Sequence, residues 1–132
     1  MRNKTYIALL AAATLWCVSI VAAPLLGLPW VYSLFSRICH QNPSRSWHIV
    51  GEPLAVCIRC TSIYFGFTAS LWLRVKANVR WLRVSILLLV CEFVVARFVL
   101  DTEFLRAVSG ILVGLSAAPF VKEAVEEIRE TV

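Results

Sequence analysis

The sequence predicts an all-α polytopic membrane protein, built as a bundle of four transmembrane helices with a short interfacial helix in its first outer loop. Apolar residues make up 60% of the 132-residue chain and charged residues only 16%, whereas soluble domains average about 25% charged residues. Four apolar runs approach the roughly 20 residues that cross a bilayer. The basic residues behind the net charge of +5 lie between these runs, where they set topology, so nucleic acid is not an expected partner. We therefore expect one membrane domain over 1–132.

The first helix is expected over 6–26, which carries no charge and follows Arg2 and Lys4. A secretory signal begins in the same way. However, Pro24 directly follows Ala23, the end of the only candidate cleavage site. Because proline is a poor residue just after a scissile bond, we interpret the segment as a retained signal anchor.

An outer loop over 27–53 follows, and it contains a short amphipathic pattern. Five apolar residues recur there with helical spacing: Trp30, Val31, Leu34, Phe35 and Ile38. Such a pattern predicts a short helix that lies in the membrane interface and carries Cys39 to the membrane surface.

The second helix is expected over 54–73. Its uncharged part is too short to span a bilayer, so the helix must begin earlier. Pro53 suits a first helical turn, and Glu52 suits the positive end of a helix dipole. This start places Cys57 and Cys60 in the first turns of a membrane helix, on one face.

The third and fourth helices are expected over 81–100 and 104–121, and a short charged tail completes the chain. The turn before the third helix is basic and the turn before the fourth is mainly acidic: Arg74, Lys76, Arg80 and Arg83 against Asp101 and Glu103. The positive-inside rule then puts both termini in the cytoplasm and the 27–53 loop outside. The expected location is the cell (inner, cytoplasmic) membrane, crossed several times.

Small residues recur every four positions in two of these helices: Ser62, Gly66 and Ser70 in the second, and Gly110, Gly114 and Ala118 in the fourth. Such faces let helix backbones approach closely in lipid. Packing within the bundle is the favoured interpretation. Besides the lipid bilayer, the alternative partner for these faces is a second copy or another membrane protein.

The clearest chemistry lies in Cys39 and His40 of the outer loop and in Cys57 and Cys60, which form a Cys-x-x-Cys pair. Three thiols and an imidazole make a four-coordinate set for a transition metal ion, with zinc the favoured metal. Because neighbouring side chains diverge, Cys39 and His40 need a bent backbone to share one ion, and His48 is a spare ligand. The leading hypothesis is an extracytoplasmic metal site at the membrane surface.

The same thiols support a redox hypothesis. Cysteines outside the cytoplasm tend to oxidise, and Arg59 together with a helix N-terminus favours a thiolate in the Cys57–Cys60 pair. The position of this pair resembles that in quinone-coupled disulfide oxidases, which implies a quinone- or thiol-linked membrane oxidoreductase with quinone as the alternative cofactor. Those enzymes carry a further cysteine pair in the second outer loop, and this chain has none there. A structural disulfide and a non-catalytic subunit of a larger membrane assembly are the remaining alternatives.

Charged residues in and beside the expected spans form a second candidate site for a cofactor or ion. Glu92 lies near the middle of the third helix, where a carboxylate is costly unless it is protonated, paired or beside a polar cavity. Arg59, Arg97 and Arg106 approach the outer interface and could form a pocket for a phosphate or carboxylate. Snorkelling to the interface is the alternative, and Asp101 is within reach of Arg97, four residues earlier on the same helix.

The cysteine motif as a whole resembles that of a known family. It comprises Cys39-His40-Gln41, Pro43 to Ser46, Gly51, and Cys57-x-Arg59-Cys60-Thr61-x-Ile63-Tyr64-x-Gly66. This set is similar to that of the prokaryotic membrane-protein family named domain of unknown function 2085. Ser62 departs from it, because glycine is expected there. The resemblance implies a multi-span membrane protein in which the cysteines and histidine act as one unit, and it implies no particular reaction.

Overall fold

The chain is mostly helical, as predicted. The computed structural model describes residues 2–41, 43–99 and 102–132. Within these residues there are five α-helices: α1 (Arg2–Leu26), α2 (Pro29–Phe35), α3 (Ile58–Leu73), α4 (Val79–Phe98) and α5 (Glu103–Thr131). Between α2 and α3 lie a 3-10 turn (Pro43–Arg45) and two short strands, β1 (His48–Ile49) and β2 (Glu52–Pro53), which pair antiparallel.

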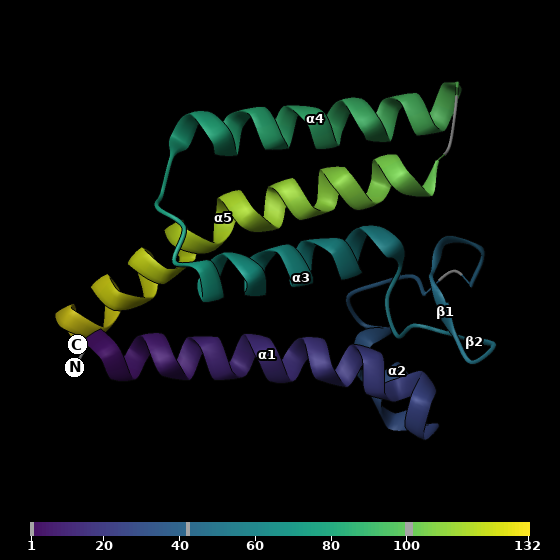
Figure 1. Ribbon diagram of the computed structural model, residues 1–132, viewed down its shortest axis with the longest axis horizontal. Helices are drawn as coiled ribbons and strands as arrows, with labels where there is room; N and C mark the ends of the chain where they lie inside the picture. Colours follow the sequence, from purple (N-terminus) through teal and green to yellow (C-terminus); the bar gives the residue numbers. More distant parts are fainter. Residues whose placement is uncertain (1, 42, 100–101) are drawn as a thin grey trace.

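The four long helices lie side by side in a single layer, in the spatial order α4, α5, α3, α1 (Figure 1). In this view α3 and α5 occupy the centre, and α1 and α4 lie on opposite sides of them. Both termini lie at one end of the layer. The segment that contains α2 and the two strands lies at the other end, which we call the loop end.

Two of the helices, α1 and α5, are long and apolar enough to cross a membrane. Helices α3 and α4 fit a membrane span less well. Helix α3 has 16 residues and a length of about 24 Å, short of the ~30 Å hydrocarbon core. Helix α4 has 20 residues but carries four charges, Arg80, Arg83, Glu92 and Arg97. Helix α5 also continues to Thr131, through the segment that we expected to be a separate charged tail.

The predicted small-residue faces of α3 and α5 pack against each other. A Cβ atom added to Gly66 would lie 2.5 Å from the carbonyl oxygen of Ile111, and one added to Gly114 would lie 2.2 Å from that of Ile63. At the same interface the Ser70 hydroxyl donates to the Leu115 carbonyl at 2.9 Å. These faces are therefore buried within one chain, and a partner protein would have to use another surface.

The prediction that the second long helix spans 54–73 is wrong at its start. Pro53 belongs to β2, where it pairs with His48, and the next backbone N–H, that of Leu54, donates to the Trp47 carbonyl at 2.8 Å. The helix begins only at Ile58, with Cys57 as its N-terminal cap residue. The apolar run before it, Leu54 to Val56, is buried in the loop end instead of continuing the helix. Glu52 accordingly does not lie at a helix start.

A hydrophobic core forms at the loop end and supports the cysteines. Its buried members come from α1, α2 and the chain before α3: Ile20, Ala23, Val31, Phe35, Leu54, Ala55 and Val56. The ring of Trp16 packs edge-on against Phe35 at 4.9 Å and against Tyr64 at 5.7 Å, which joins α1 to α2 and α3. Helix α2 was predicted, and it turns Val31 and Phe35 inward while Trp30, Leu34 and Ile38 remain exposed.

Candidate metal centre

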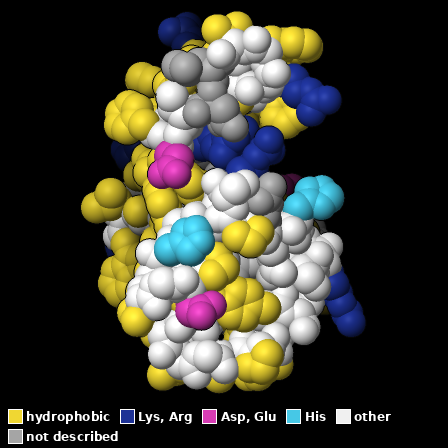
Figure 2. All heavy atoms as spheres, turned by 90° about the vertical axis from the view of Figure 1, so that its right-hand side faces the viewer, with side chains coloured by type: hydrophobic (Ala, Val, Ile, Leu, Met, Phe, Trp, Pro, Cys, Tyr) yellow, Lys and Arg dark blue, Asp and Glu magenta, His cyan; other side chains and the backbone are white. Residues whose placement is uncertain are grey.

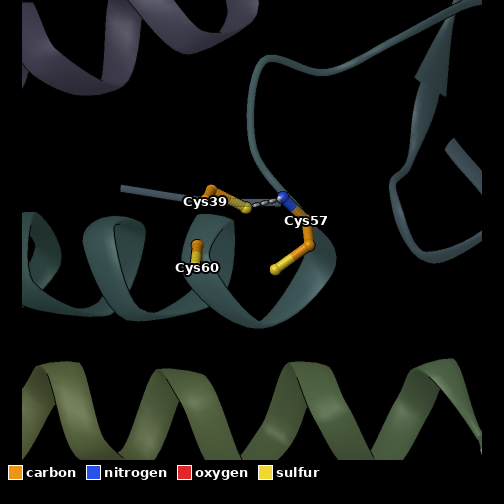
Figure 3. Close-up of side chains that lie close together, drawn as sticks. All are labelled: Cys39, Cys57 and Cys60. Carbon is orange, nitrogen blue, oxygen red and sulfur yellow. Dashed lines mark hydrogen bonds between the residues drawn. The ribbon is translucent and has the colours of Figure 1, made fainter. Parts of the chain in front are cut away.

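Three cysteines come together at the loop end. Cys39 lies just after α2, Cys57 caps α3, and Cys60 lies in the first turn of α3. Figure 3 shows Cys39 reaching toward the start of α3, where the other two lie. The three sulfur atoms all lie within 4.8 Å of one another, so they could hold one metal ion.

Backbone hydrogen bonds position Cys39. Its own N–H donates to the Phe35 carbonyl at 3.0 Å, which ties it to the end of α2. Its Sγ accepts a hydrogen bond from the Cys57 N–H at 3.3 Å (Figure 3). This contact holds the Cys39 sulfur against the first residue of the Cys57-x-x-Cys60 pair.

The Gln41 side chain links the two segments that carry the cysteines, a role that the sequence pattern did not predict. Its side-chain Nε2 donates to the Tyr32 carbonyl at 2.7 Å and to the Ala55 carbonyl at 2.8 Å. Gln41 itself adopts a left-handed backbone conformation, with φ of 50°. It therefore bends the chain after Cys39 and fastens α2 to the segment that leads into α3. Its place directly after Cys39-His40 was the only signal for this role.

The environment of Cys57 favours its thiolate. A hydrogen bond from the Cys60 thiol lowers the pKa of Cys57 to about 5, against the opposing effect of burial, and a hydrogen bond with Cys39 adds to the lowering. Cys57 is consequently ionised at neutral pH. Because the thiolate is both the metal ligand and the nucleophile of cysteine chemistry, Cys57 is prepared for either role.

The two histidines lie apart from the sulfur atoms. His40 is exposed and does not belong to the group of ligand atoms within 4.8 Å of one another, although it lines the same cavity as the cysteines. His48 is exposed on β1. Of the predicted four-ligand set, the structure thus groups the three thiols and leaves the imidazole at the cavity wall.

A cavity of about 380 Å³ adjoins the three cysteines, and basic side chains line its other walls: Arg45, Arg59 and Arg106, together with His40. A smaller hollow of about 60 Å³ continues from it and adds Arg97 from α4. The arginines predicted from the sequence therefore meet beside the cysteines. Arg45 joins them from the 3-10 turn and was not predicted.

Glu92 is buried and paired with Arg59. Its Oε2 lies 2.7 Å from Nη2 of Arg59, and the Arg59 guanidinium also lies 5.4 Å over the Phe93 ring. The ion pair therefore connects α3 to α4 across one end of the layer. Glu92 does not line the cavity beside the cysteines. The expected contact between Arg97 and Asp101 lies outside the described residues, because Asp101 is not among them.

The remaining cysteines lie away from the cluster. Cys17 is buried between α1 and α3, where its Sγ lies 3.1 Å from the Thr68 hydroxyl oxygen. Cys91 is exposed on α4. All five cysteines are free thiols in this structure.

Comparison with known proteins gives a family match over a segment that contains Cys39, Cys57 and Cys60. An uncharacterized protein of Methanocaldococcus jannaschii is 53% identical over 36 residues, which make up 27% of this chain and 23% of that protein. An uncharacterized protein of Methanothermobacter thermautotrophicus is 30% identical over 97 residues, 67% of this chain and 87% of that protein. No solved structure is significantly similar to the chain. Residues 39–120 match the family described as predicted membrane protein (DUF2085), and the chain therefore belongs to that family.

Proposed function

We propose that this membrane protein carries a metal site at its extracytoplasmic end, formed by Cys39, Cys57 and Cys60. The observation that carries the proposal is the approach of the three sulfur atoms to within 4.8 Å of one another. Sulfur ligands of one tetrahedral zinc ion lie about 3.8 Å apart, because each Zn–S bond is about 2.3 Å long. Small side-chain rotations are therefore enough for the three thiolates to share an ion.

Zinc is the metal that we propose, because thiolates are soft ligands and zinc accepts them in tetrahedral sites. The fourth position has two candidate ligands. His40 lines the same cavity as the sulfurs and completes a closed, structural site if its ring turns inward. Water or a small molecule in the cavity completes an open site instead, as in catalytic zinc centres.

We further propose that α1, α3, α4 and α5 all cross the membrane, with both termini in the cytoplasm. The ends of the chain lie together at one end of the layer (Figure 1). Basic residues gather at that end. For example, Arg74 and Lys122 each lie 5.1 Å from the centre of the Tyr6 ring. The positive-inside rule assigns such an end to the cytoplasm and the cysteine cluster to the opposite side.

Labelling of intact cells with a membrane-impermeant maleimide tests this topology. The background carries serine at all five native cysteines, and a single reporter cysteine is added. A reporter at Val50, which is 83% exposed in the hairpin, is expected to be modified in intact cells. A reporter at Lys76, exposed between α3 and α4, is expected to react only after lysis. The reverse pattern would remove the proposed orientation.

Elemental analysis of the purified protein tests the metal site. We expect about one metal ion per chain, lost in the Cys57→Ser and Cys60→Ser variants and weakened in Cys39→Ser. Loading is expected to fall as the pH drops toward 5, because protons then compete with the metal for the thiolates and Cys57 keeps its negative charge only above about pH 5. Thiol counting on the same samples completes the measurement.

The matched control for these variants is Cys91→Ser, which removes an exposed thiol on α4 and should leave the metal content unchanged. His40→Ala separates the two kinds of site. Loss of metal in His40→Ala indicates a closed site, and retention indicates an open one. Wild-type protein that is purified without chelator and contains no metal, but has a quantitative Cys57–Cys60 disulfide, would contradict the metal proposal.

That last outcome would favour the second candidate function, a thiol oxidoreductase. One specific feature of the site supports it: the Cys60 thiol donates a hydrogen bond to Cys57 and lowers the pKa of Cys57, which favours the Cys57 thiolate. In such a pair the ionised cysteine attacks and its neighbour completes the disulfide. Oxidation of the Cys57 thiolate and the Cys60 thiol to a disulfide releases two electrons and one proton. A membrane quinone can accept these together with a second proton from water, which reduces it to the quinol.

A further inference from the structure

We propose that the arginine-lined cavity beside the cysteines binds a phosphate group, either as free phosphate or as the headgroup of a lipid. Four guanidinium groups line the cavity and its smaller extension, and they come from four different parts of the fold: Arg45, Arg59, Arg97 and Arg106. No aspartate or glutamate lines either hollow among the described residues. Guanidinium groups bind phosphate through paired hydrogen bonds. Several arginines around one cavity, without acidic residues beside them, are therefore suited to bind an oxyanion.

The burial of Arg106 and of the Arg59 Nε atom supports a ligand more strongly than the charge of the arginines alone. Arg106 is only 6% exposed, a rare position for a cation. Arg59 has one nitrogen paired with Glu92, but its buried Nε has no hydrogen-bond partner among the described residues. A buried N–H without an acceptor is unfavourable. An oxyanion in the cavity would supply that acceptor.

The cavity is open to its ligand and large enough for it. Its volume of about 380 Å³ is many times the ~30 Å³ that one water molecule takes in the liquid. Figure 2 looks at the loop end and shows basic side chains in a recess between the upper and lower halves of the molecule, with an acidic side chain nearby. A free anion can enter there from water. A lipid headgroup can enter there from the membrane surface, because this end lies at the interface in the proposed topology.

The cysteines share a wall of this cavity, so a bound phosphate would lie beside them. Thiolates repel an anion, and a metal ion held by them reduces that repulsion. We therefore expect phosphate to bind more tightly to the metal-loaded protein than to protein stripped with a chelator. Phosphate recognition itself rests on the arginines and not on the proposed metal.

Calorimetric titration of the full chain in detergent with inorganic phosphate tests the free-anion source. The lipid source is tested by native mass spectrometry of the protein from nanodiscs that contain phosphatidylglycerol or only phosphatidylcholine. The variants are Arg45→Gln and Arg97→Gln, both at exposed positions, and Arg106→Lys, which keeps the buried charge. We expect each to weaken phosphate binding or phosphatidylglycerol retention about tenfold, as for loss of one charged hydrogen bond.

The matched control is Arg37→Gln, which removes an exposed loop arginine outside the cavity lining and should change neither measurement. Phosphate binding without lipid retention supports a free anion, and the converse supports a headgroup. Equal weakening in Arg37→Gln, no change in the three cavity variants, or no binding in either arm would overturn the proposal. Metal content is measured on the same samples, so failure of the metal site is recognised separately. Arg45→Gln should retain its metal in every case.

Discussion

A Gly114→Val variant is expected to prevent the close packing of α3 and α5, on which the whole helix layer depends. Even a Cβ atom at this position would lie 2.2 Å from the Ile63 carbonyl oxygen and 2.6 Å from the Phe67 nitrogen. Both are backbone atoms, so the clash cannot be relieved by a change of side-chain rotamer. We expect a loss of about 3 kcal/mol of stability or more, at the upper end for overpacked sites. Thermal unfolding in detergent, followed by size-exclusion chromatography, measures it.

Ala69→Val is the matched control for this prediction. It places the same valine side chain at an exposed position of α3, three residues beyond Gly66. We expect its melting temperature to stay close to that of the wild type, since Ala69 is exposed. Gly114→Ala should lie between the two. Equal melting temperatures for wild type and Gly114→Val would show that α3 and α5 do not approach as closely as described.

A Glu92→Ala variant is expected to destabilise the protein by about 3 kcal/mol, because it leaves the Arg59 guanidinium without its counter-charge. The carboxylate of Glu92 is 6% exposed and its Oε2 lies 2.7 Å from the Arg59 side chain. Within the described residues, α4 packs mainly on α5 and has few other direct contacts with α3. We therefore expect both a lower melting temperature and faster proteolysis of α4 in the purified protein.

Three comparisons isolate the ion pair. Glu123→Ala removes an exposed carboxylate of α5 and is expected to have no measurable effect. Glu92→Gln keeps a hydrogen-bond acceptor and should lose less stability than Glu92→Ala. The double variant Arg59→Met with Glu92→Leu removes both charges, and it should recover much of the loss. If Glu92→Ala melts like Glu123→Ala, the pair does not hold α4 in place.

Sequence patterns predicted the four long helices, because long, mainly apolar runs have few alternatives to a helix in a membrane. They failed at the start of α3. The apolar residues Leu54 to Val56 suit a buried extended segment as well as a helix, and only the tertiary core at the loop end decides between the two. They also missed the end of α5. Its charged residues are strong helix formers, so the helix continues beyond the apolar run.

The candidate site was predictable where it depends on local spacing. Cys57 and Cys60 share one helical turn, as their spacing requires. The ion pair of Arg59 and Glu92 was not predictable, because helical periodicity ranks only partners within the same helix. The position of the His40 side chain, apart from the three sulfur atoms, could not be predicted from the sequence either. Neighbouring side chains diverge, and the left-handed conformation of Gln41 next to it is a property of the folded loop.

The shortness of α3 gives bilayer thickness a direct bearing on the cysteines. At about 24 Å the helix is some 6 Å shorter than a typical hydrocarbon core. If it spans as proposed, hydrophobic mismatch must be relieved by thinning the lipid around it or by drawing the loop end down among the headgroups. In a thin membrane the thiols would then be exposed to water, and in a thick membrane they would lie among the lipid headgroups. Lipid acyl-chain length thus becomes a variable that tunes access to the site without any change in the protein.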